Sequence, residues 1–304
     1  MLDRLRRRQY RWQLDQVLAP LIAALRQRDG QFLRRLAHQG IDLLYPPTCA
    51  LCGAPGDAGR DLCAGCHADL PLIGAHCARC AKPFPVAALD HDSTATWPHA
   101  AGLCGHCQRQ PPPFERCIAA FRYEDPLPIL VGGIKFQSKL NLIRLLGELL
   151  AEKLEDERQR PGWQPPEAIL PVPLHPRRLR VRGYNQALEL ARLVSRRLDI
   201  PINHRCCQRM RSTQAQSALN EQLRFSNIHG AFEVTSTRTL PRRIAILDDV
   251  VTTGATVSEL ARVLKRAGCE RIDIWALART TMTRPNPTPI RVQPEYSRFS
   301  LQTP

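Results

Sequence analysis

The sequence predicts an α/β fold with a doubly wound, mostly parallel sheet, preceded by a small cysteine-rich domain. In the second half of the chain, short apolar runs rich in β-branched residues alternate with segments of helical periodicity. This alternation is typical of parallel strands joined by crossover helices. Ahead of it, eight of the twelve cysteines form four Cys-x-x-Cys pairs. A length of 304 residues leaves room for both domains.

The cysteine pairs occupy the segment 43–113, which is rich in Pro and Gly. Two residues between thiolates place both sulfurs on one tetrahedral metal, so two such pairs complete a closed structural zinc site. Disulfides are the competing interpretation, but they need an oxidising compartment, for which the sequence carries no signal. We therefore predict a double zinc ribbon with one or two structural zinc ions. Its ligands would be Cys49, Cys52, Cys63, Cys66, Cys77, Cys80, Cys104 and Cys107.

The assignment of pairs to metals stays open at this point. Consecutive pairing joins the first two pairs in one site and the last two in another, and interleaved pairing is also compatible with the spacing. Three histidines beside the thiols could replace a ligand or remain solvated loop residues: His67, His76 and His106. Four cysteines without partner spacing are expected to be reduced core or surface thiols: Cys117, Cys206, Cys207 and Cys269.

The α/β region is expected over 114–282, after a stiff Pro111–Pro113 linker. Strands and helices alternate through it, beginning and ending with a strand: 117–123, 140–154, 169–174, 185–198, 244–247, 253–267 and 272–277. The run Ile244–Leu247 is apolar throughout, as expected of a strand buried on both faces. Outside this region we expect a basic helical N-terminal extension, 1–42, and a disordered Pro-rich tail, 283–304.

Two acids and a loop of small polar residues follow the strand 244–247. The segment Asp248–Gly254 is expected to be the turn into the next helix, and ligands bind outside the carboxyl ends of parallel strands. Backbone N–H groups at the helix start favour a phosphate there. The carboxylates would repel phosphate, but they accept hydrogen bonds from sugar hydroxyls and bind Mg²⁺. The pattern predicts a sugar-phosphate site, with a capped helix after an acidic turn as the alternative.

This stretch resembles a known motif. Residues Ile246–Thr256, with the sequence ILDDVVTTGAT, are similar to the phosphoribosyl pyrophosphate (PRPP) motif of type I phosphoribosyltransferases. The resemblance implies a sheet of that enzyme class, PRPP bound with Mg²⁺, and contacts from Asp248 and Asp249 to the ribose hydroxyls. It assigns the phosphate to five residues: Thr252, Thr253, Gly254, Ala255 and Thr256.

An arginine-rich segment, His175–Gln186, leaves the strand 169–174 at the same edge of the sheet and holds four arginines. Guanidinium groups match phosphate oxygens in a bidentate way, so pyrophosphate suits this segment. Its Arg-Gly-aromatic element is similar in position to the pyrophosphate loop of phosphoribosyltransferases, which assigns Arg182 and Gly183 to pyrophosphate. A solvated arginine loop is the alternative.

The polar segment Arg209–Arg224 precedes the predicted strand 244–247, which leads into the PRPP motif. It resembles the Arg-x-Thr-x-x-Gln loop of glutamine amidophosphoribosyltransferases, although the spacing here is Arg211-Ser-Thr213-Gln-Ala-Gln216. The resemblance implies a mobile lid that excludes water from the reacting centre. An exposed polar linker is the alternative.

The order of the motifs, together with Pro-Pro-x-Phe, Ile-Lys-Phe and Pro-Val-Pro-Leu elements, resembles the competence protein F family over about Leu43–Thr280. That resemblance implies a double zinc ribbon attached to a phosphoribosyltransferase domain. In some bacteria the family is tied to the handling of incoming single-stranded DNA during natural transformation. The resemblance names no acceptor substrate.

Net charge and hydropathy limit the classes of partner that the chain can have. Lys plus Arg exceed Asp plus Glu by 43 − 28 = +15, which favours polyanions. The extension 1–42 contributes nine arginines and could bind DNA or an acidic membrane surface, or pack on the body as a soluble helix. The longest early apolar stretch, Val17–Leu25, has nine residues and contains Pro20. We therefore expect no signal peptide or transmembrane segment, and a cytoplasmic protein.

Two classes of function remain. As a binding module, the protein would hold PRPP and associate with single-stranded DNA, with DNA-uptake proteins at the inner face of the membrane as candidate partners. As an enzyme of nucleotide or base metabolism with no DNA role, it would transfer phosphoribose. Asp248 and Asp249 would then position the ribose, and Arg182 would stabilise the leaving pyrophosphate.

Overall fold

The computed structural model describes residues 46–84, 102–136, 140–211, 228–235 and 240–281. The predicted extension 1–42, the tail 283–304 and residues 212–224 of the expected lid lie outside these residues. Within the described part of the chain, no helix combines the length and the apolar character needed to cross a membrane.

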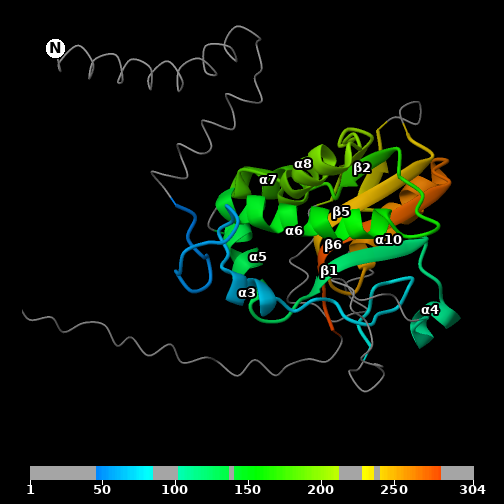
Figure 1. The fold of residues 1–304 in the computed structure, drawn as a ribbon. Helices are drawn as coiled ribbons and strands as arrows, with labels where there is room; N and C mark the ends of the chain where they lie inside the picture. The colour runs from blue at the N-terminus through cyan, green and yellow to red at the C-terminus, as the bar shows by residue number, and fades with distance from the viewer. Residues whose placement is uncertain (1–45, 85–101, 137–139, 212–227, 236–239, 282–304) are drawn as a thin grey trace, which may run out of the picture.

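A four-stranded parallel sheet forms the centre of the molecule, with the strand order β1-β6-β5-β2 (Figure 1). The strands are β1 (Arg116–Arg122), β2 (Ala168–Pro171), β5 (Arg243–Val251) and β6 (Arg271–Arg279). This confirms the predicted α/β fold with a parallel sheet after a cysteine-rich region.

Helices cover both faces of the sheet, so its strands are apolar on both sides. Ala245 and Leu247 of β5 belong to one core cluster, and Ile244 and Ile246 to the other. The first face is covered by α5 (Leu127–Phe136), α6 (Leu140–Arg158) and α8 (Gln186–Leu198). The second face is covered by α10 (Ala255–Arg266) and by the antiparallel pair β3 (Cys207–Arg209) and β4 (Phe232–Val234).

The winding of the chain reverses between β2 and β5. The long helix between β2 and β5 in the chain, α8, packs on one face of the sheet, and the helix that follows β5, α10, packs on the other. Ligands of open parallel sheets bind at such a reversal. β2 ends at Pro171, which pairs with Leu247, whereas β5 continues to Val251. In the described part of the chain no strand pairs with this edge of β5 beyond Leu247, so a crevice opens beside the last four residues of β5.

The structure corrects two strand boundaries. β5 includes Asp248 and Asp249, which we had placed in the turn, because β6 continues beside them as far as the pair Val251↔Arg279. The strand predicted over 169–174 ends at Pro171. The Val172 N–H still donates to the Leu247 carbonyl of β5 at 2.9 Å, but Pro171 and Pro173, on either side of it, have no N–H with which to extend the strand on its other edge.

Two helices of the α/β region were not expected. Part of the predicted arginine loop is the helix α7 (Pro176–Arg182), which His175 caps by accepting from the Arg177 N–H at 3.2 Å. Gly183 ends α7 with a left-handed φ of 79°. The other helix, α5, contains Gly132 and Gly133, which favour coil. Its helical state depends on burial of its apolar face, which holds Leu127, Leu130, Val131 and Ile134.

The cysteine-rich region is bound to the outer edge of the sheet. The Arg122 N–H donates to the Pro71 carbonyl at 2.8 Å, and the Ile73 N–H donates to the Ala120 carbonyl at 3.2 Å. Leu62 and Leu70 join the core under α6. Two short helices, α3 (Ala64–Ala68) and α4 (Gly105–Arg109), belong to this region. The ribbons and the α/β domain therefore share one packed body.

Candidate functional site

The eight paired cysteines form two clusters of four. The first comprises Cys49, Cys52, Cys63 and Cys66, and the second comprises Cys77, Cys80, Cys104 and Cys107. Within each cluster all sulfurs lie within 4.8 Å of one another, so the pairing is consecutive and not interleaved. His67, His76 and His106 are not members of either cluster. Cys117, Cys206, Cys207 and Cys269 are buried free thiols.

The sulfur geometry fits zinc. A tetrahedral zinc with Zn–S bonds of about 2.3 Å separates its sulfurs by about 3.8 Å, and the Cys52–Cys63 and Cys80–Cys104 pairs lie at 3.7 and 3.8 Å. These distances are far too long for disulfides. Burial opposes ionisation of Cys104, but the Cys107 N–H and the neighbouring thiols outweigh it and lower the pKa of Cys104 to about 7. Burial and neighbouring sulfurs raise the pKa of Cys107. Four adjacent thiolates need a cation, so the two clusters are consistent with two structural zinc ions.

The crevice beside β5 holds a cavity of about 670 Å³. Its lining includes five cationic residues, Lys135, Arg177, Arg178, Arg182 and Arg209, and two acids, Asp248 and Asp249. The lining side chains therefore carry a formal charge of 5 − 2 = +3. A site of this kind attracts an anion that carries several charges.

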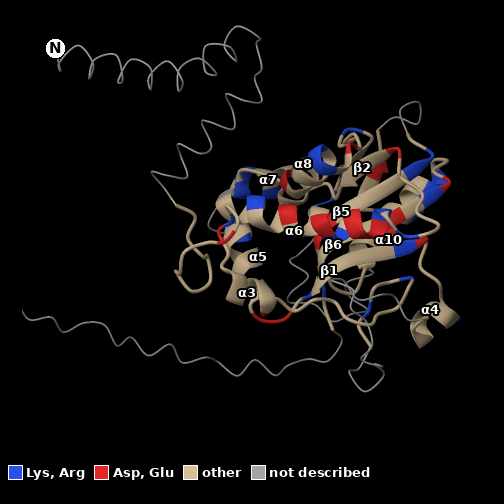
Figure 2. Cartoon of the chain, viewed as in Figure 1, with Lys and Arg blue, Asp and Glu red and all other residues tan. Residues whose placement is uncertain are grey.

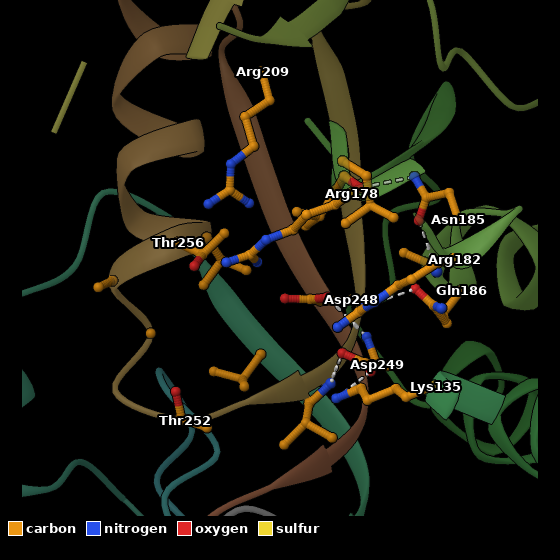
Figure 3. Close-up of a pocket in the computed structure, with 18 of the residues that line it drawn as sticks. Lys135, Arg178, Arg182, Asn185, Gln186, Arg209, Asp248, Asp249, Thr252 and Thr256 are labelled. Atoms are coloured by element: carbon orange, nitrogen blue, oxygen red, sulfur yellow. Dashed lines mark hydrogen bonds and ion pairs between the residues drawn. The ribbon is translucent and has the colours of Figure 1, made fainter. Parts of the chain in front are cut away.

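The two acids face different parts of the crevice, because successive side chains of a strand point to opposite faces. The Asp249 carboxylate lies 2.6 Å from Lys135 Nζ at the end of α5 (Figure 3). Burial alone would lower the pKa of Lys135, but the carboxylates outweigh it and raise that pKa above its ordinary value. Asp248 points toward the other face, where α10 and β3 lie. Burial and the Asp249 charge raise the pKa of Asp248 to about 8.

Four arginines from α7 and β3 line the cavity: Arg177, Arg178, Arg182 and Arg209. In Figure 3, Arg178 and Arg209 point toward the start of α10, and Arg182 points toward the acid pair. Burial and then the Arg178 charge lower the pKa of Arg209 to about 10, and burial and the Arg182 charge lower the pKa of Arg178. Because these cations disfavour one another, an anion between them would relieve the repulsion.

The loop between β5 and α10 supplies an anion site of backbone groups. Gly254 caps α10 with a φ of 82° and offers no side chain to the N–H groups of the first turn. That turn contains no acidic residue. Thr253 Oγ1 accepts from the Ala255 N–H at 3.3 Å, so the hydroxyl lies at the helix start. The geometry and the helix dipole together favour a phosphate at this end of α10.

Most residues that the sequence predicted for this site line one cavity. They are Arg182, Asp248, Asp249, Thr252, Gly254, Ala255 and Thr256. Two predicted residues do not line it: Thr253, which lies in the loop, and Gly183, which lines a neighbouring cavity of about 590 Å³. The sequence analysis assigned no individual contact to Lys135, Arg178 or Arg209, although these residues belong to the Ile-Lys-Phe element, the arginine-rich segment and the expected lid. Lys135 carried one usable signal, because it is a cation at the end of an otherwise apolar run, LPILVGGIKF.

Isosteric substitution of the two neighbouring acids is expected to change stability in opposite directions. Asp248 keeps its proton up to about pH 8 when folded, whereas the unfolded chain loses it near pH 4, so the folded state loses relative stability as pH rises between these values. Asp248→Asn removes this loss. Without ligand, its midpoint temperature should exceed that of the parent at pH 8, and the difference should shrink toward pH 4.5.

Asp249→Asn is the matched control, because it removes the partner of Lys135 at 2.6 Å. It should lower the midpoint at pH 8, since a half-buried cation loses its carboxylate. Scanning calorimetry of the three proteins across this pH range makes the comparison. Equal effects of both variants would contradict the assigned electrostatics.

The chain is similar over most of its length to bacterial proteins. It is 34% identical over 224 residues to "Competence protein F" of Haemophilus influenzae, covering 73% of this chain and 92% of that protein. It is also 34% identical over 242 residues to "DNA utilization protein YhgH" of Escherichia coli, covering 78% and 99%. "Competence protein ComFC" of Streptococcus pneumoniae is 26% identical over 162 residues, covering 53% and 67%. A family model described as a double zinc ribbon domain matches residues 40–108.

Proposed function

The chain belongs to the competence protein F family, and from that premise we propose that it binds PRPP with Mg²⁺ and acts in DNA uptake by associating with single-stranded DNA. The observation that carries the proposal is the meeting of an acid pair, a helix N-terminus and a group of guanidiniums in one cavity. Together these three features match the ribose hydroxyls, the 5-phosphate and the pyrophosphate of PRPP.

The loop residues Thr252–Thr256 would bind the 5-phosphate through backbone N–H groups and threonine hydroxyls. Asp248 and Asp249 would accept from the ribose hydroxyls, and Lys135 orients the Asp249 carboxylate at 2.6 Å. Arg182, which points toward the acid pair, would hold the pyrophosphate. Arg178 and Arg209, which point toward the start of α10, would add their charge to the 5-phosphate site, where an anion would offset the repulsion that lowers their pKa values. Carboxylate oxygens are also suitable ligands for Mg²⁺, which would neutralise pyrophosphate charge.

Association with DNA is supported by the names of the relatives and by charge. The +15 net charge of the whole chain favours a polyanion. In the described part, many cations are paired with acids: Arg144, Arg160 and Arg197 all lie within 4.0 Å of a carboxylate. Figure 2 shows this mixture of signs along α6 and α8. Because many of the described arginines are paired, we infer that the net positive charge of the whole chain, rather than a patch on α6 or α8, provides most of the attraction for DNA.

The test measures both ligands on one set of proteins. A fluorescent single-stranded oligonucleotide is titrated at several salt concentrations, alone and with PRPP and Mg²⁺. The parent is compared with Asp248→Asn/Asp249→Asn and with a charge-matched control, Asp69→Asn/Asp199→Asn, whose acids are exposed and do not line the crevice. We expect PRPP to bind the parent and the control only, and oligonucleotide affinity to fall steeply with salt in all three.

Two results would contradict the proposal. If Asp248→Asn/Asp249→Asn still binds PRPP, the acid pair is not the ribose site. Oligonucleotide binding that is absent at physiological salt would remove the DNA role, and the positive charge would then serve small phosphates or a protein partner. Pyrophosphate release with bases or amines as acceptors would show turnover, and therefore the transferase function of nucleotide or base metabolism.

A further inference from the structure

Arg279, the last residue of β6, lies between the second cysteine cluster and the loop after β5. Its side chain is buried, with 5% of the residue exposed. Its Nε donates to the carbonyl oxygen of Cys80, a member of the second cluster, at 2.9 Å. Its Nη1 donates to the carbonyl of Val251 at 3.0 Å and to the carbonyl of Thr252. One guanidinium group therefore joins the two sites.

The carbonyls that Arg279 binds determine where the loop directs its N–H groups. A trans peptide unit is planar, so its carbonyl and the N–H of the next residue point in opposite directions. Holding the carbonyls of Val251 and Thr252 against Arg279 turns the N–H groups of Thr252 and Thr253 away from it. Thr280 holds the same two carbonyls: its N–H donates to the carbonyl of Val251 at 3.2 Å, and its hydroxyl donates to the carbonyl of Thr252 at 3.3 Å.

Electrostatics links Arg279 to the cluster as well. Four thiolates around Zn²⁺ carry a net charge of about −2. In the described part of the chain, Arg279 forms no ion pair with a carboxylate, and its hydrogen-bond partners are the carbonyls already named and that of Thr280. A loaded cluster would therefore offset the buried guanidinium charge and hold Arg279 in place.

We propose that Arg279 is a positioning residue that couples zinc occupancy of the second cluster to phosphate binding by the loop after β5. The inference rests on the PRPP-binding function proposed above and adds zinc control to that site. Zinc fixes the Cys80 segment, the Cys80 carbonyl orients Arg279, and Arg279 orients the first peptide units of the loop. Because coupling between two sites is reciprocal, a bound phosphate also retains zinc in the second cluster.

The first cluster provides an internal comparison. Arg60, in the first ribbon, contacts Glu148 at 4.0 Å and Glu152 of α6. Among the described contacts, none joins Arg60 to the loop after β5. Arg60→Met is thus a matched control that removes a guanidinium between a ribbon and the α/β domain without touching the phosphate loop.

The experiment uses the full chain loaded with two equivalents of zinc. Zinc release to a chromogenic chelator is followed with and without PRPP and Mg²⁺, and PRPP affinity is measured by calorimetry. In the parent, PRPP should slow the release of one zinc ion and leave the other unchanged. Arg279→Met should abolish this protection and weaken PRPP binding about tenfold, within the usual range of coupling between sites. Arg279→Lys, with fewer donors, should lie between them, and Arg60→Met should match the parent.

Each outcome bears on the proposal. If Arg279→Met retains two zinc ions, binds PRPP like the parent and keeps the protection, Arg279 has no coupling role. If PRPP binds the parent but both zinc ions leave at unchanged rates, the coupling is absent while the proposed function stands. If PRPP does not bind the zinc-loaded parent, the proposed function fails and the coupling with it. If Arg279→Met does not fold, the release measurement on the parent decides.

Discussion

Cys77→Ser is expected to lose one of the two zinc ions and to destabilise the chain by on the order of 5 kcal/mol. Cys77 is fully buried, and its sulfur accepts the Cys104 N–H at 3.2 Å. Structural zinc sites contribute about 10–16 kcal/mol of binding free energy in isolated zinc-finger peptides, so losing one ligand removes a large part of the local stability. Mass spectrometry measures the number of bound zinc ions, and thermal unfolding measures the loss of stability.

Cys269→Ser is the control for this prediction. Cys269 is also buried, but its thiol donates to the carbonyls of Arg242 and Arg271 at 3.2 and 3.4 Å, and a serine hydroxyl can donate to the same atoms. This variant should keep both zinc ions and lose about 1 kcal/mol. A Cys77→Ser protein with two zinc ions and parental stability would contradict a metal site at the second cluster.

What the sequence predicted well is contiguous in the chain. The run Ile244–Leu247 shows a buried strand without any knowledge of its neighbours, and the Cys-x-x-Cys spacing shows metal-binding turns. Where a neighbouring strand determines the boundary of an element, the local sequence did not predict that boundary. The strand continues through Asp248 and Asp249 because β6 pairs with it, and two acids beside a glycine loop indicate a turn more than a strand.

The contacts of the site that were not predicted join segments distant in the sequence. Lys135 reaches Asp249 only because the helix α5 packs against the sheet. Helix propensity does not predict α5, because it contains two glycines. Arg209 belongs to the short strand β3, whose partner β4 lies beyond the expected lid. Arg279 is the final residue of an apolar strand, where its contact with Cys80 has no sequence signature. Such contacts are set by tertiary packing.

Gly254→Ala is expected to weaken PRPP binding about a hundredfold, or nearly 3 kcal/mol. At a φ of 82°, a side chain costs about 1 kcal/mol or more, so the loop will relax toward negative φ. The nearest atoms to an added Cβ lie 4.0 Å away, so the loss reflects backbone strain and not a clash. Relaxation would turn the N–H groups of the first turn of α10 away from the phosphate, and each charge-assisted hydrogen bond lost costs about 1.5–3 kcal/mol.

Gly268→Ala separates this effect from general destabilisation. Gly268 follows the other end of α10, has a φ of 104°, and has no atom within 4 Å of an added Cβ. Both variants should therefore lose similar stability, while only Gly254→Ala loses PRPP affinity in calorimetric titrations with Mg²⁺. Equal affinity in the two variants would mean that the phosphate is held by side chains of the crevice. Loss in both would mean that affinity follows the stability of α10 and not the direction of its N-terminal N–H groups.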